Sequence, residues 1–384
     1  MSQVPSEAAS ARSWNGNGWL SEQESVYLDL LRVLATHLVL LSHGYSLILR
    51  LNDKPYLQNA GGLGVVLFFI MSGFLISSVL SRADLSYEGL KAYAIERASR
   101  IFVPFIPALL LVAAVDAAFH LTIDTAATNN NGAVPLAFNI LLLNDYPVLQ
   151  VVSELSHSST IFVRSYRGGE QFWTIPVEFW IYMCAGIAYI GYFNRVTISR
   201  TANIVLAVSL PVVLWNCFAG GGQGLSIVWL LGVLAYLLRQ WITTNRAAYR
   251  LALVGLIIST VCIAGRVSKI GPDPYDLLLE TFISWMFLSI MILIGRKKMR
   301  LMPIGRSVIR RMAAYSYSLY LTHNIIFIAV SHFALGVRGL LFAIIISHVY
   351  AQLHWYLFER HYRSIGASLK KRFSRSVAVN SSVL

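Results

Sequence analysis

Charged residues are scarce in this chain of 384 residues. Asp, Glu, Lys and Arg together make up 13% of the sequence, whereas hydrophobic residues make up 56% and the mean hydropathy is +0.61. Ordinary soluble domains contain about 25% charged residues. The composition therefore excludes a typical soluble domain and indicates a protein that is largely embedded in a membrane.

Several common signatures are also missing. The three cysteines, Cys184, Cys217 and Cys262, fall in or at the ends of apolar segments, where they are expected to pack rather than form disulfides. No Cys/His spacing is typical of a metal site, and we expect no bound metal. The sequence contains no phosphate-binding glycine loop, no dinucleotide fingerprint and no G-x-S-x-G motif. No basic segment followed by a short apolar core marks a cleavable signal peptide.

Long apolar runs fill most of the chain. A membrane-spanning helix needs about 20 mostly apolar residues, and about ten segments qualify. No linker or internal repeat divides them, so we predict an all-α, polytopic membrane protein with a single helical bundle. The expected domains are a disordered cytoplasmic N-terminus (1–25), a transmembrane domain (26–360) and a basic, loosely structured cytoplasmic tail (361–384). The predicted spans are 27–49, 61–80, 100–122, 172–193, 201–217, 224–242, 250–266, 277–295, 312–331 and 335–357.

The net charge of +13 raises the alternative of nucleic-acid binding. When the segments between spans are assigned alternately to two sides, about three quarters of the Lys and Arg residues lie on the side of both termini. That asymmetry follows the positive-inside rule, so we expect both termini to be cytoplasmic and no nucleic-acid partner. The 123–171 segment is then an extracytoplasmic loop, which is either functional or a variable connector.

Ionisable residues in the first predicted span share one helix face. At about 100° per residue, Arg32 and His43 differ by about 20° around the axis, and Asp29 lies within about 60° of both. His37 points elsewhere. Ionisable groups inside a span are costly and usually face a protein-lined or aqueous interior. This pattern predicts the wall of a pathway, in which His43 is a candidate catalytic base.

A carboxylate is predicted at a similar depth in the fourth span. Glu178 and His43 each lie about six residues from the outer end of their span, or roughly 9 Å below the surface. Glu178 could therefore orient the His43 ring, a catalytic arrangement. The alternative is a buried hydrogen bond with only a structural role.

Two further patterns allow both a functional and a structural interpretation. Ser72 and Gly73 in the second span could leave room for a substrate, although small residues usually permit close helix packing. Arg97 and Arg100 at the inner end of the third span share a face and suit a phosphate group, although arginines are expected at an inner surface anyway. In the tenth span, Glu359 is expected to pair with a basic neighbour and lock helix packing.

Taken in order, these motifs resemble the acyltransferase family 3 of integral-membrane acyltransferases over about residues 27–360. Departures are Leu30, Thr174, Pro176 and His361, at positions where the family usually has other residues. The motifs are Asp29, Arg32 and His43; Phe68-Phe69 with Ser72-Gly73-Phe74; Arg97 and Arg100 before Pro104; Trp173, Glu178 and Tyr182; Ser316-Tyr317 with Tyr320-Leu321 and His323; and Glu359-Arg360.

The resemblance implies an enzyme of the cytoplasmic (inner) membrane that moves an acyl group, often acetyl, from cytoplasmic acyl-CoA. The implied acceptor is a hydroxyl of an extracytoplasmic carbohydrate, such as lipopolysaccharide O-antigen, exopolysaccharide or a glycolipid. No bound cofactor is implied. Arg97 and Arg100 would hold the CoA phosphates, and Arg32 would guide the donor or polarise its thioester. The pantetheine arm would pass Ser72 and Gly73.

His43 would act as base in that scheme, with Glu178 tuning it, while Trp173, Tyr182, Tyr320 and His323 would line the pathway. The main alternative from another class is a transporter or flippase whose buried ionisable residues form a proton relay. A transporter of that kind would consume no acyl-CoA.

Overall fold

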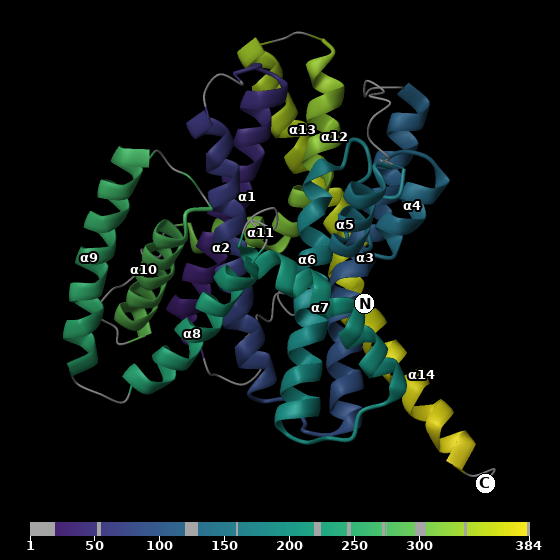
Figure 1. The fold of residues 1–384 in the computed structure, drawn as a ribbon. Coiled ribbons are helices and arrows are strands. Elements are labelled where there is room, and N and C mark those ends of the chain that lie inside the picture. The colour runs from purple at the N-terminus through teal and green to yellow at the C-terminus, as the bar shows by residue number, and fades with distance from the viewer. Residues whose placement is uncertain are drawn as a thin grey trace, which may run out of the picture.

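The computed structural model describes residues 20–51, 55–119, 130–158, 160–218, 224–243, 247–270, 273, 275–295, 305–333 and 336–381 (Figure 1). Across these residues the regular structure is helical and no strand occurs, which confirms the all-α prediction. The helices are α1 (Glu22–Leu47), α2 (Pro55–Leu80), α3 (Tyr87–Phe119), α4 (Ala133–Ile140), α5 (Pro147–Ser156), α6 (Thr174–Gly186), α7 (Arg200–Phe218), α8 (Leu225–Thr243), α9 (Ala247–Ile270), α10 (Leu277–Gly295), α11 (Arg306–Ala314), α12 (Ser316–Ser331), α13 (Gly336–Leu357) and α14 (Tyr362–Ser381).

Most predicted spans correspond to helices long and apolar enough to cross a membrane. Among the described residues, eight segments meet that condition, including a 3-10 turn (Glu170–Trp173), α6 and a π-helical turn (Ile187–Phe193) that run as one unit. The two other predicted spans correspond to α8, of 19 residues, and α12, of 16 residues. The chain is therefore a multi-pass integral membrane protein.

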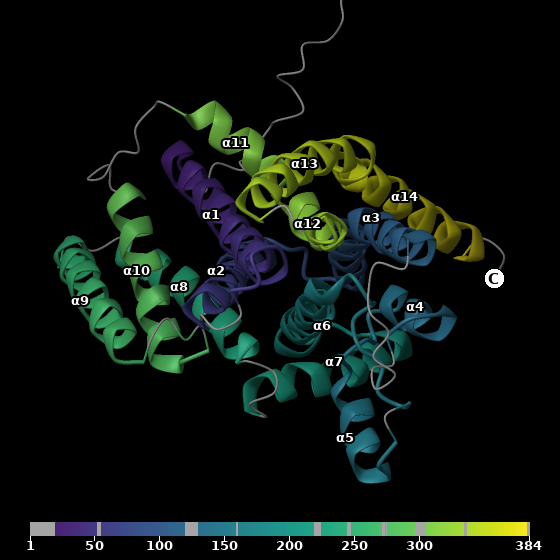
Figure 2. The ribbon, with the colours of Figure 1, turned by 90° about the horizontal axis from the view of Figure 1, so that it is seen from above.

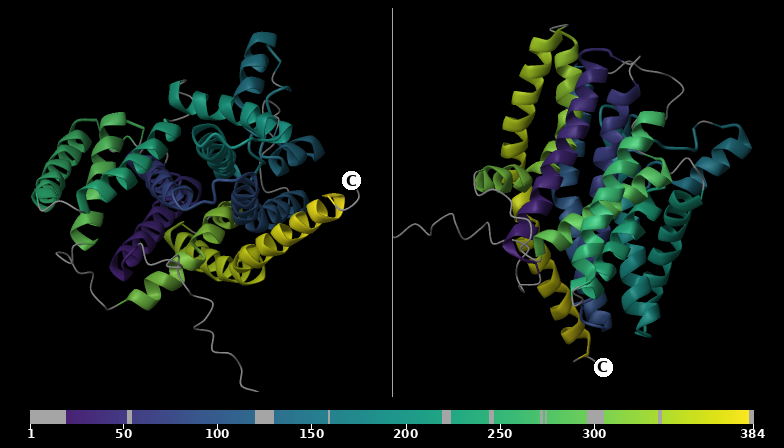
Figure 3. Two further views of the ribbon diagram at one scale, coloured as in Figure 1. Left: turned by 90° about the horizontal axis from the view of Figure 1, so that it is seen from below. Right: turned by 90° about the vertical axis from the view of Figure 1, so that its left-hand side faces the viewer.

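The helices α1 and α2 occupy the middle of the bundle. Seen from above, α8, α9 and α10 lie on one side of them, α12 and α13 on another, and α6 and α7 on a third (Figure 2). The helix α13 leads through a short turn into α14, which runs along α3 (Figure 3). Because α1 packs against α2, α10, α12 and α13, residues on its faces can meet several helices at once.

Glycine permits close approach of α2 and α8. A Cβ atom placed on Gly73 would meet the backbone carbonyl of Trp229, and one placed on Gly232 would meet the carbonyl of Ile70. The two glycines thus bring the two helix backbones together in the way that small residues do in membrane proteins. This contact supports the packing interpretation of Gly73, and its role beside a CoA arm stays a prediction.

Three boundaries differ from the predicted ones. The helix α3 begins at Tyr87, thirteen residues before the predicted span, because its first turns are polar and escape a hydropathy criterion. The predicted span 312–331 is divided at Tyr315 into α11 and α12. The tail is helical as far as Ser381, whereas a loose segment was expected. Of the predicted disordered N-terminus, residues 1–19 lie outside the described residues.

The predicted outer loop contains structure of its own where it is described. Asn139 of α4 is fully buried, and its amide oxygen accepts a hydrogen bond from the backbone N–H of Tyr166. Arg167 forms a 3.0 Å ion pair with Asp116 of α3. The first contact joins two parts of the loop, and the second attaches its end to α3, immediately before the segment that enters α6.

We predict that Gly73→Ala destabilises the protein by about 1–3 kcal/mol, because the added methyl group must push the backbones of α2 and α8 apart. Gly265→Ala is the matched control, since nothing lies within 4 Å of the added Cβ there. Thermal unfolding of the purified variants in detergent measures the difference. Equal midpoints for both variants would contradict the close approach of α2 and α8.

Candidate functional site

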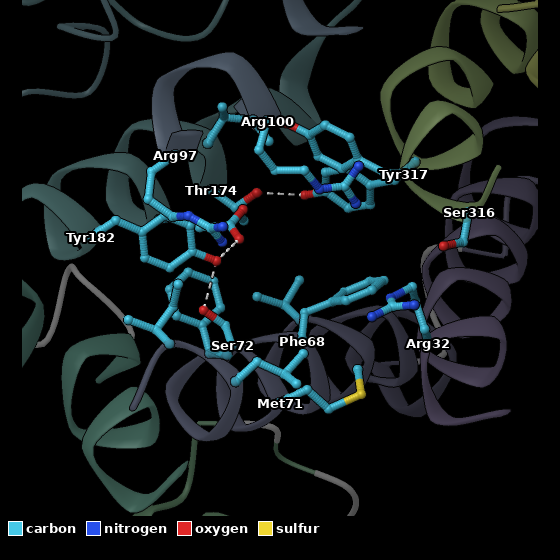
Figure 4. Close-up of a pocket in the computed structure, with 17 residues that line it drawn as sticks. Arg32, Phe68, Met71, Ser72, Arg97, Arg100, Thr174, Tyr182, Ser316 and Tyr317 are labelled. Atoms are coloured by element: carbon cyan, nitrogen blue, oxygen red, sulfur yellow. Dashed lines mark hydrogen bonds between the residues drawn. The ribbon is translucent and has the colours of Figure 1, made fainter. Parts of the chain in front are cut away.

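A small cavity, of about 110 Å³, lies where α1, α2, α3, α6 and α12 converge (Figure 4). Its wall combines three arginines with a carboxylate, hydroxyl groups and aromatic rings. It brings together seven of the predicted site residues: Arg32, Ser72, Arg97, Arg100, Glu178, Tyr182 and Tyr320. The other lining residues are Val65, Phe68, Phe69, Met71, Leu75, Ile76, Thr174, Ile175, Ser316 and Tyr317.

Arg97 is the arginine with an unsatisfied buried donor. Its side chain is 7% exposed, and one of its terminal nitrogens forms a 3.0 Å ion pair with Glu96. Its Nε atom is buried and has no hydrogen-bond partner among the described residues. A buried donor of this kind costs free energy until it finds an acceptor, so Arg97 is suited to an anionic ligand.

Arg100 is held by a second carboxylate. It forms a 2.7 Å ion pair with Glu359, whose other oxygen accepts hydrogen bonds from the backbone N–H and hydroxyl of Ser318 at 3.1 and 2.7 Å. The guanidinium also lies over the rings of Tyr317 and Tyr362, 5.2 and 5.0 Å from their centroids. Glu359 pairs with a basic neighbour as predicted, and it ties α3 to the end of α13.

Arg32 reaches the cavity from α1. Its Nη1 lies 3.0 Å from the carboxylate of Asp29, one turn earlier on the same helix. Asp29 does not line the cavity. Asp29 instead pairs with Arg32 and orients its guanidinium group from the side.

The carboxylate of Glu178 is at one end of a directed hydrogen-bond chain. Tyr182 donates its hydroxyl hydrogen to Glu178, so the hydroxyl of Ser72, 2.8 Å away, must donate to the Tyr182 oxygen. The indole N–H of Trp229 donates in turn to Ser72 at 3.2 Å. This series of hydrogen bonds fixes Ser72 and Tyr182 at the cavity wall.

A second group of polar residues lies between α1 and α12. Nδ1 of His43 is 3.1 Å from Nε2 of His323, and the ring centroids are 5.0 Å apart. Nδ1 of His323 lies 3.1 and 2.8 Å from the carbonyl oxygens of Leu319 and Tyr320. Asn324 also interacts with His43. Neither histidine lines the cavity described above.

The predicted pairing of Glu178 with His43 is wrong. Glu178 lies in the cavity near the arginines, whereas His43 meets His323. The depth estimate assumed that the fourth span starts at the membrane surface near Phe172. In the structure Glu170 already reaches Asn324, the neighbour of His323, so Glu178 lies about two helical turns beyond the level of the histidines and lines the cavity instead. Trp173 packs against the core and does not line the cavity.

Sequence reasoning missed two residues next to the histidines. The side-chain amide of Asn324 donates to the carboxylate of Glu170 at 2.6 Å and to the carbonyl of Gly168 at 3.2 Å. Asn324 follows His323 directly, which was a usable signal. Glu170 offered none, because it precedes the apolar run and belongs to the outer loop by sequence.

Comparison with known proteins gives one family and a partial relative. A family model described as an acyltransferase domain, of acyltransferase family 3, matches residues 25–351. The chain is 29% identical over 163 residues to the O-acetyl transferase of Shigella phage Sf6. That alignment covers 42% of this chain and 44% of the phage protein, so the chain spans less than half of its relative. No solved structure matches.

We predict that Glu359→Ala destabilises the protein by about 3–5 kcal/mol, because it leaves the Arg100 charge buried without a partner. Glu88→Ala is the control, since the Glu88 carboxylate is 60% exposed, against 3% for Glu359, and its pair with Lys91 should contribute less than about 1 kcal/mol. Thermal unfolding of both variants compares the two pairs. Similar small losses would show that the Arg100–Glu359 pair does not hold α3 to α13.

Proposed function

Because the chain belongs to the acyltransferase family whose model matches residues 25–351, we propose that it transfers a short acyl group, acetyl, from acetyl-CoA to a carbohydrate hydroxyl. In this proposal the donor binds from the cytoplasm and the acceptor is an extracytoplasmic glycan or glycolipid. The similarity to the O-acetyl transferase of Shigella phage Sf6 supports the acetyl group and the oxygen acceptor.

One observation is the main support: α1 joins the arginine cavity to the histidine pair. Arg32 lines the cavity, and His43 meets His323 eleven residues further along the same helix, roughly 16 Å away. A donor whose phosphates bind at the arginines could extend its thioester along α1 toward His43. Separate donor and acceptor ends of one helix suit transfer across a membrane.

The chemistry then follows from the residues present. An imidazole nitrogen of His43 takes the proton of the acceptor hydroxyl, and the oxygen attacks the thioester carbonyl carbon. The carbon–sulfur bond breaks, the acyl group stays on the acceptor oxygen, and the CoA thiolate leaves with the proton that His43 returns. Atoms and charges balance without a metal or further cofactor.

The distribution of basic residues supports the orientation. In this proposal both termini face the cytoplasm, as the positive-inside rule predicts, and the Arg97 end of α3 then lies on the side of soluble acyl-CoA. The proposed location is the cytoplasmic membrane, with membrane lipid as the surrounding partner.

We predict that His43→Ala lowers acyl transfer by about 10²–10⁴-fold, as expected for loss of a general base. His37→Ala is the matched control, because His37 is on the same helix but lies against His348, with ring centroids 5.2 Å apart. The measurement is mass spectrometry of surface glycans from cells expressing each variant. If the His43→Ala variant acylates glycans as well as the wild type does, the base is another residue. If cells expressing the wild-type protein show no acylated glycan and the protein consumes no acyl-CoA, the proposed function is rejected.

We predict that Arg97→Ala raises the KM for acetyl-CoA by roughly 10–100-fold, the value of a hydrogen bond to a charged group. Arg82→Ala is its control, because Arg82 hydrogen-bonds the carbonyl and hydroxyl of Ser78 and does not line the cavity. Steady-state kinetics in detergent would separate the two. An unchanged KM in Arg97→Ala would place the donor phosphates elsewhere.

A further inference from the structure

The hydrogen positions on the His43–His323 pair can be deduced from its surroundings. Nδ1 of His323 faces the carbonyl oxygens of Leu319 and Tyr320, at 3.1 and 2.8 Å. Carbonyl oxygens only accept hydrogen bonds, so this nitrogen must be the one with the hydrogen. In the neutral ring the other nitrogen, Nε2, then has a lone pair and can only accept.

His323 is well suited to remain neutral. Its side chain is 1% exposed. Among the described residues its hydrogen-bond partners are two carbonyl oxygens and His43, none of which has a negative charge. A protonated His323 would be a buried cation without a counter-ion, which is costly in an apolar interior.

The position of the hydrogen on the neutral His43 ring follows from that of His323. Its Nδ1 lies 3.1 Å from the accepting Nε2 of His323, so Nδ1 must supply the hydrogen. We propose that His323 is a positioning residue: it holds His43 in the tautomer with hydrogen on Nδ1, which leaves Nε2 with the lone pair that accepts the acceptor's proton. This proposal rests on the function proposed above and identifies the reacting nitrogen of that site.

The outer loop supplies a second part of this arrangement. Both side-chain amide hydrogens of Asn324 are used, by the carboxylate of Glu170 at 2.6 Å and by the carbonyl of Gly168 at 3.2 Å. The outer loop thereby fixes the side chain of Asn324, which follows His323 directly and interacts with His43.

The tautomer matters because the two ring nitrogens are not equivalent to a substrate. A base needs a lone pair directed at the proton that it removes. The nitrogen with the hydrogen is set by the hydrogen bond that the other nitrogen makes. Without an acceptor at Nδ1, His43 can place its hydrogen on Nε2 and present an N–H group to the acceptor hydroxyl, which is unproductive.

The first test is spectroscopic and needs no substrate. Protein with ¹⁵N-labelled histidine is prepared in lipid nanodiscs, and the His43 signals are assigned by their loss in His43→Gln. His37 provides an internal reference, because its Nδ1 lies 2.7 Å from the carbonyl of Val33 and must also have the hydrogen. The proposal predicts the Nδ1–H pattern for His43 in wild type and its loss in His323→Leu. An Nε2–H pattern in wild type, or an unchanged pattern in His323→Leu, would overturn it.

Kinetics of two His323 variants form the second test. His323→Leu removes the acceptor and should lower kcat about 10²-fold or more with the KM for acetyl-CoA unchanged. His323→Gln offers an amide oxygen to Nδ1 of His43 and should recover part of the loss. Equal kcat values for the Leu variant and wild type, or equal losses in both variants with both folded, would contradict the positioning role. If wild type itself transfers no acyl group, the function fails while the tautomer is still decided by the spectra.

Discussion

The cost of burying charge in an apolar interior is the constraint on which this structure depends. An unpaired ion in a membrane protein is expensive, so each ionisable side chain inside the bundle needs a partner. Ion pairs meet much of this need. Three of them also join separate elements: Glu24 with Arg239, Arg100 with Glu359, and Asp116 with Arg167. Two others lie within one helix: Asp29 with Arg32, and Glu96 with Arg97. At the cavity, the buried Nε atom of Arg97 has no hydrogen-bond partner among the described residues.

The helix α1 links the two polar regions that this constraint creates. Arg32 faces the cavity and pairs with Asp29. His43 faces α12, where it interacts with His323 and Asn324. The close approach of α2 and α8 at Gly73 and Gly232 leaves Ser72 fixed at the cavity wall. Packing and chemistry thus use neighbouring positions of the same helices.

The sequence was sufficient for the fold class, because ten apolar runs indicate helices in a membrane whatever their packing. The family resemblance implied a common donor pathway for Arg32, Arg97 and Arg100, and all three line one cavity. The sequence failed for contacts between helices: Glu178 was placed beside His43 by counting residues from an assumed membrane surface, whereas Glu170 is the residue that reaches the neighbour of His323. His43 contacts His323 because α1 packs against α12, and the periodicity of the sequence does not show which helices pack together. Gly73 allowed two interpretations, and the position of the Trp229 carbonyl, which the sequence does not give, favours close helix packing.

The central claim is that one helix joins a donor site on one side of the membrane to an acceptor site on the other. Inside-out membrane vesicles from cells expressing the protein test it directly, with radiolabelled acetyl-CoA added to the outer medium only. The account predicts label on glycans inside the vesicles, resistant to an added deacetylase until detergent opens the membrane. Label that the deacetylase removes from intact vesicles would place donor and acceptor on the same side and contradict the account.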